Sequence, residues 1–121
     1  MTGQEAFEQA MGLLGYANGN GLRNDNALLQ RALPILNAVY GDLYYVSEKK
    51  KPYKPIVSIA EEVPLPERVT NDCFVYGVAM WLAQSENDGD NQQLFASIYN
   101  QKRAGASHWG RRIDIFEGGC L

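Results

Sequence analysis

The chain of 121 residues has little of what catalysis and metal binding usually need, with only two cysteines and one histidine. Cys73 lies inside an apolar segment and Cys120 is next to last, so their spacing fits neither a disulfide framework nor a metal site. A nucleophilic pair of Cys73 and His108 would need an accessible thiolate, whereas Cys73 is expected to be buried. We therefore expect free thiols, no catalytic residue, no metal and no cofactor.

Long apolar runs and a surplus of positive charge are also missing. Eleven basic and fourteen acidic residues give a formal charge of −3, which does not favour binding to phosphate backbones. No segment is apolar over the length of a membrane span, and no secretory signal opens the chain, so we expect a protein of the cytoplasm. The hydrophobic share of 45% predicts one packed domain over residues 1–121.

Two helices are expected in the first third of the chain. Thr2 and Glu5 have the spacing of a capping box, which predicts a short helix that ends near Gly15. A second, longer helix follows a cap at Asn24 or Asp25, with apolar residues at three-and-four spacing as far as Leu43. Pro34 lies inside this pattern and predicts either a kink or a boundary.

Two further helices are expected after residue 66. A central helix over 69–86 is apolar around much of its circumference, and Gly77 within it would let a neighbouring helix approach closely. Asp88 or Asp90 then caps a fourth helix that reaches about Ala104. The same aspartates do not predict an EF-hand, because the glutamate at the twelfth loop position is missing.

The segment 47–66 combines a lysine cluster, several prolines and the short β-branched run Ile56–Ile59. The lysines favour a solvated loop over a phosphate or partner contact. The run predicts one small strand, which must pair either with another piece of this chain or with a neighbouring molecule. The tyrosines nearby fit an interface and the rim of a core equally well. They are Tyr40, Tyr44, Tyr45 and Tyr53.

The stretch 109–116 partly alternates like a strand and follows a run of small residues. We expect it to form an arm that adds itself to another protein, the alternative being an arm that folds back on its own helices or pairs with Ile56–Ile59. The predicted fold is mainly α: a small four-helix bundle with a long loop carrying a short β element and an extended C-terminal arm. The helical body takes about 1–104 and the arm about 105–121.

The order of these parts resembles the head-tail connector proteins of tailed bacteriophages. The likeness covers Asn24 to Ala104 and is best in the segment PLPERVTNDCFVYGVAMWLAQSENDGDNQQLFASIYNQKRA, where Leu-Pro opens the central helix, an acidic turn follows and Tyr-Asn closes the fourth helix. The resemblance implies a non-catalytic virion protein of the neck, assembled in the host cytoplasm. It also implies a ring of identical subunits under the portal, with twelvefold symmetry as the expectation. This ring continues the DNA channel and docks the tail or a stopper protein.

Two sets of interaction residues follow from the resemblance and from the loop and arm patterns. In the connector family the C-terminal arm reaches the portal, which here assigns portal binding to Trp109, Arg111, Arg112, Ile113, Ile115 and Phe116. The loop is expected to supply contacts between subunits through Lys50, Tyr53, Ile56, Val57 and Ile59. DNA would pass without sequence-specific binding. The alternative function is a small non-catalytic module, of phage or host, that binds one partner protein through the same arm.

Overall fold

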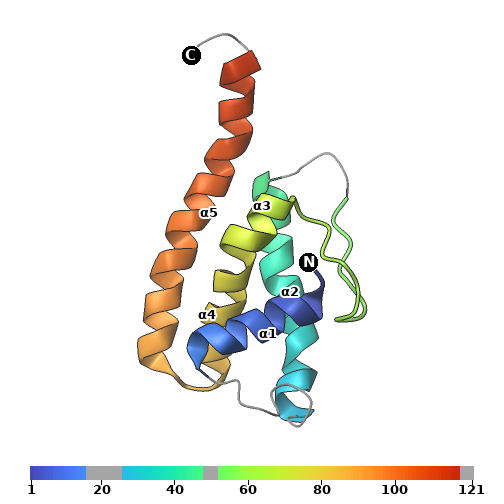
Figure 1. The fold of residues 1–121 in the computed structure, drawn as a ribbon, viewed down its shortest axis with the longest axis vertical. Coiled ribbons are helices and arrows are strands. Elements are labelled where there is room, and N and C mark those ends of the chain that lie inside the picture. Colours follow the sequence, from blue (N-terminus) through green and yellow to red (C-terminus); the bar gives the residue numbers. More distant parts are fainter. Residues whose placement is uncertain (16–25, 48–51, 118–121) are drawn as a thin grey trace.

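The computed structural model describes residues 1–15, 26–47 and 52–117, with the backbone alone at 26–29, 47 and 106–117. This part of the chain is mainly helical, which confirms the predicted fold class (Figure 1). Its elements are α1 (Gly3–Leu14), α2 (Asn26–Ser47), α3 (Glu67–Val69), the π-helical turn η2 (Thr70–Phe74), α4 (Val75–Ser85) and α5 (Gly89–Glu117).

Helix α1 begins and ends as its sequence predicts. The Thr2 hydroxyl accepts a hydrogen bond from the Glu5 amide at 3.1 Å, and the Glu5 carboxylate accepts one from the Thr2 amide at 2.9 Å. This reciprocal pair satisfies two amides that the first turn leaves without partners. Gly15 ends the helix at a φ of 76°, where a side chain would be strained. The apolar stripe of α1 is buried, including Phe7 and Met11.

Helix α2 runs through Pro34 without a break, so of the two predicted outcomes at this proline, a kink or a boundary, the boundary is wrong. Pro34 is exposed, while Leu36, Val39 and Leu43 are buried. The missing amide therefore lies on the solvent side of the helix, and burial of the opposite face offsets its cost.

The central helix is formed by α3, η2 and α4 in succession. It packs against α1, α2 and α5, as its apolar circumference predicts. Cys73, Phe74, Val78 and Leu82 are fully buried. The π turn begins at Thr70, whose hydroxyl donates to the Glu67 carbonyl oxygen at 3.0 Å. All three neighbouring helices are thus organised around this element.

The β element of the loop lies at a different place from the one predicted. In the described residues 52–66 no strand forms at Ile56–Ile59, and the only pairing is an isolated antiparallel bridge between Thr2 and Glu62. The amides of Gly3 and Gln4 donate to the carbonyl oxygens of Glu61 and Ile59, at 3.1 and 2.7 Å. The start of α1 therefore satisfies backbone groups for which the sequence suggested a strand partner.

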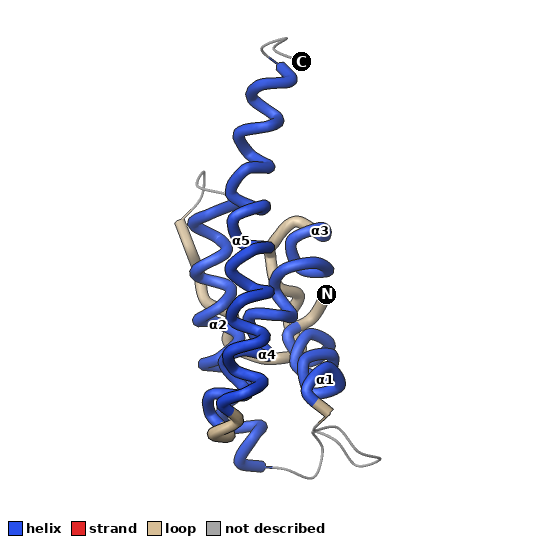
Figure 2. The backbone as a smooth tube through the Cα atoms, turned by 90° about the vertical axis from the view of Figure 1, so that its left-hand side faces the viewer, coloured by secondary structure: helices blue, strands red, loops and turns tan. Residues whose placement is uncertain are grey.

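The C-terminal arm is a helix, so the strand-like interpretation of 109–116 is wrong. Helix α5 continues to Glu117, and its last turns project beyond the other helices instead of folding back on them (Figures 1 and 2). Helical hydrogen bonds within α5 satisfy the backbone there without a partner strand. The same letters also fit a helix, because Trp109, Ile113 and Phe116 stand at the i, i+4, i+7 spacing.

Candidate interaction surfaces

The first half of α5 is fixed to the body by Tyr99, which fills a notch at Gly77. A Cβ atom placed on Gly77 would lie 2.6 Å from the Tyr99 ring and 2.6 Å from a methyl carbon of Val39. Only glycine leaves room for this approach of α2, α4 and α5, as the sequence predicts. Tyr99 is 5% exposed, and its position holds α5 in one register.

A polar network next to this notch ties α5 to α2. The Asp42 carboxylate accepts a hydrogen bond from the Tyr99 hydroxyl at 2.6 Å and two from Arg103, at 2.7 and 2.9 Å. Burial acts to raise the pKa of Asp42, but the hydrogen bonds from Arg103 and Tyr99 outweigh it, so this pKa lies below its ordinary value. Burial, and then the bond to Asp42, raise the pKa of Tyr99. Asp42 is therefore an ionised acceptor shared by two donors.

A second ion pair joins α5 to the π turn. The Lys102 ammonium lies 2.6 Å from the Asp72 carboxylate and 5.1 Å from the centre of the Tyr76 ring. The hydrogen bond to Asp72 raises the pKa of Lys102. The two ion pairs, Arg103–Asp42 and Lys102–Asp72, anchor α5 to α2 and to the central helix. They fix the direction in which the rest of the helix leaves the body.

The residues predicted to bind the portal lie in the projecting part of α5. Trp109, Arg111, Arg112, Ile113, Ile115 and Phe116 all belong to its last three turns. Their side chains lie outside the described residues. The helix brings the six positions together on one element.

The predicted tyrosine cluster forms on one side of α2. We call the residues 52–57 the strap, and the side of α2 that it covers, formed by Tyr40, Gly41, Tyr44 and Tyr45, the tyrosine face. The ring of Tyr53 in the strap lies 4.9, 6.0 and 6.1 Å from the rings of Tyr40, Tyr44 and Tyr45. Such aromatic pairs stabilise a contact beyond their buried area.

Asn37 holds the strap on this face through three hydrogen bonds. Its side-chain amide donates to the Ile56 carbonyl oxygen at 2.9 Å and accepts from the Ile56 amide at 2.9 Å, as a paired strand would. Its backbone carbonyl accepts from the Tyr53 hydroxyl at 3.2 Å. One side chain therefore replaces the strand partner that the loop was expected to need.

The predicted subunit contacts are divided by this arrangement. Ile56 is buried in the core of its own chain, and Tyr53 and Ile59 are partly buried against it. Val57 is 78% exposed and presents an apolar side chain to solvent. Lys50 lies outside the described residues.

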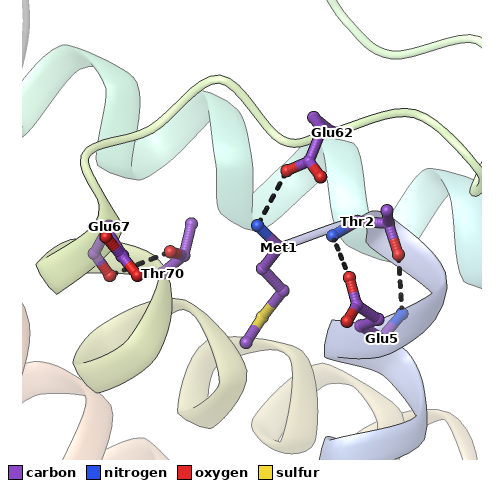
Figure 3. Close-up of polar contacts among 6 residues, drawn as sticks. All are labelled: Met1, Thr2, Glu5, Glu62, Glu67 and Thr70. Carbon is purple, nitrogen blue, oxygen red and sulfur yellow. Dashed lines mark hydrogen bonds and ion pairs between the residues drawn. The ribbon is translucent and has the colours of Figure 1, made fainter.

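A polar cavity of about 630 Å³ lies between the start of α1, residues 62–65 and the π turn. Figure 3 shows its main contacts, the α-amino group of Met1 at 2.8 Å from the Glu62 carboxylate and the capping pair of Thr2 and Glu5. The hydrogen bond from the Thr2 amide lowers the pKa of Glu5. These polar groups already have partners within the chain. Their contacts link residues 62–65 to the start of α1.

Cys73, His108 and Asp88 are the residues that the sequence offered as candidates for catalysis or metal binding. Burial, followed by the negative charges of Asp72 and Asp42, raises the pKa of the Cys73 thiol to about 12, which disfavours a thiolate. The side chain of His108 lies outside the described residues. The Asp88 carboxylate accepts from the Asn91 side chain at 2.7 Å and stands 3.4 Å from its amide, as a helix cap would. Within the described ranges no three metal-binding side chains converge.

Sequence reasoning missed the two polar anchors of the fold. Asn37 stands one turn before Gly41 on the tyrosine face, and a lone amide on an aromatic stripe is the signal that could have revealed it. Asp42 and Arg103 are far apart in sequence and leave no local pattern, so their pairing needs the packed helices.

No protein-family model, curated protein or solved structure matches this chain. None of the helices in the described residues is long and apolar enough to cross a membrane.

Proposed function

We propose that the chain is a structural subunit of a tailed-phage connector, an adaptor that forms a ring of identical copies beneath the portal. The observation that carries the proposal is the projection of α5 from an otherwise packed helical body (Figure 2). A helix without neighbours over its last turns leaves a surface for another protein to cover.

The anchors at the base of the projection support this role. Asp42 and Asp72 hold Arg103 and Lys102 immediately before the helix leaves the body. A partner that binds the end of α5 would therefore pull on two ion pairs and on the Tyr99 notch. Force on the helix is transmitted to α2 and to the central helix.

The overall charge agrees with a channel that DNA passes through. A chain of net charge −3 does not hold phosphate backbones strongly, and DNA must slide during packaging and ejection. In this proposal the body continues the channel and offers its far end to a tail or stopper protein.

The portal protein encoded in the same genome provides the test. Purified chain, with and without portal, is measured by size-exclusion chromatography with light scattering. A complex of portal with many copies of the chain is expected. A chain that binds one partner with a single copy would instead support the small interaction module.

A further inference from the structure

One stripe of positions runs along the whole of α5. Positions that repeat at alternating steps of four and three residues lie on one side of a helix. We call the set that has this spacing in α5 the α5 stripe, and its members are Phe95, Tyr99, Lys102, Ala106, Trp109, Ile113 and Phe116. The α5 stripe begins in the packed body and continues on the same side of the helix into the projecting part.

The body covers the first half of the α5 stripe with apolar side chains of other helices. Phe95 and Tyr99 are both buried. The ring of Phe95 stacks on the ring of Tyr76 at a distance of 6.0 Å between their centres, and Tyr99 fills the notch between Gly77 and Val39. A surface of α2 and α4 therefore receives the stripe here.

Carboxylates stand at the edge of this covering surface. Lys102 lies 2.6 Å from Asp72, and Arg103 lies 2.7 Å from Asp42. Arg112 occupies a position directly beside the stripe in the projecting part of α5. A surface that covers the second half in the same manner would be apolar and would place a carboxylate beside Arg112.

The second half of the α5 stripe continues beyond the cover that the body provides. Among the described residues, no other helix lies beside this part of α5 (Figures 1 and 2). Its positions are occupied by Trp109, Ile113 and Phe116, at the i, i+4 and i+7 spacing by which a helix anchors in a groove of another protein. Addition as a strand does not fit, because a helix already satisfies its own backbone groups.

We propose that the end of α5 binds its partner as a helix laid in an apolar groove with a carboxylate at its edge, anchored by Trp109, Ile113 and Phe116. The inference rests on the proposed function, in which this partner is the portal. It divides the six residues that the sequence assigned to portal binding. Arg112 lies at the edge of the contact, whereas Ile115 occupies a position on another side of the helix and lies outside the contact.

Ile113 and Ile115 provide a matched pair for the test. They are residues of one type on one helix, and they lie on different sides of a helix but on the same side of a strand. Isothermal titration calorimetry measures the affinity of the full chain for the purified portal. Ile113→Ala is expected to weaken binding at least about tenfold, as the loss of an anchor does, and Ile115→Ala to change it less than about twofold. Equal losses in the two variants overturn the helical contact.

Arg112 and Arg111 test the charged edge in the same way. Arg112→Ala is expected to weaken binding about threefold at low salt and less at high salt, because salt screens an ion pair at the rim of an interface. Arg111 occupies a position away from the stripe, so Arg111→Ala is expected to have a smaller effect. A loss for Arg111→Ala as large as that for Arg112→Ala overturns the register of the contact.

Two controls separate this inference from loss of structure and from other occupants. Circular dichroism is expected to show unchanged helix content in all variants, since alanine is the best helix former. Light scattering without portal is expected to give the same mass for the unchanged chain and for Ile113→Ala. A larger free particle that Ile113→Ala alone dissociates would make a second copy the occupant, and would overturn the portal groove.

The failure of the groove differs from the failure of the proposed function. If the unchanged chain binds the portal and the two isoleucine variants lose affinity equally, only the groove is overturned. If the unchanged chain binds the portal no better than a chain that ends at Ala104, the proposed function fails and the groove fails with it.

Discussion

At the scale of single residues, Gly77 sets how closely three helices approach. Replacing it by alanine puts a Cβ atom 2.6 Å from both Tyr99 and Val39, so helices must move apart. We expect Gly77→Ala to lower the free energy of unfolding by about 1–3 kcal/mol, as overpacking does. Urea unfolding followed by circular dichroism measures it.

Gly12 provides the matched control for this prediction. It also lies inside a helix, but a Cβ atom there would meet nothing within 4 Å. Gly12→Ala is expected to raise stability by about 0.5–1 kcal/mol, because alanine loses less backbone entropy in a helix. If the two variants shift stability equally, the notch does not hold α5.

Asp42 makes stability depend on pH. Because its pKa in the folded state lies below the ordinary value of 3.8, its contribution is present above that value and is lost as pH falls through the folded pKa. At neutral pH, Asp42→Asn is expected to cost about 1 kcal/mol, less than is usual for hydrogen bonds to a charged group, since the Asp42 side chain is 40% exposed and solvent screens it.

Thermal unfolding of the unchanged chain and of Asp42→Asn between pH 7 and pH 2 checks this prediction. The difference between them is expected to shrink as pH falls below the ordinary value of 3.8. A difference that stays constant into acid would show that Asp42 is not the titrating group. Tyr99→Phe, which removes one donor and keeps the ring, is expected to reduce the pH dependence only in part.

At the scale of elements, local signals in the sequence located most helices and misjudged the loop and the arm. The capping box at Thr2 and the glycine at position 15 act within one turn, so they could be recognised without the fold. The alternation over 109–116 is compatible with two periods, and continuity with α5 decides between them. Asn37 could have been singled out as a lone amide among aromatic residues, but its hydrogen bonds to Ile56 could not be assigned, because they depend on where the loop returns to α2.

The division of α5 into an anchored part and a projecting part predicts that the body folds without the latter. Tyr99, Lys102 and Arg103 all lie before residue 105. A chain that ends at Ala104 is therefore expected to unfold within about 1 kcal/mol of the full chain, since distant surface changes have small effects. Urea unfolding measures this, and a truncated chain with a molten or unfolded spectrum would mean that the end of α5 packs into its own body.

At the scale of the whole molecule, the fold consists of a packed helical body and the projecting end of α5. The body is held together by the central helix and by the loop whose carbonyl oxygens at Ile59 and Glu61 accept hydrogen bonds from the start of α1. Among the described residues, no other helix lies beside the end of α5 in either view (Figures 1 and 2). The candidate site could be predicted only as a position in the sequence, because its exposure depends on where the other helices end.

The most direct test of the account is electron microscopy of the purified full chain mixed with its portal, next to the chain that ends at Ala104. The account predicts a ring of copies attached to the portal for the full chain, and bare portals for the truncated but folded chain. A full chain that remains a monomer and leaves the portal bare would contradict it.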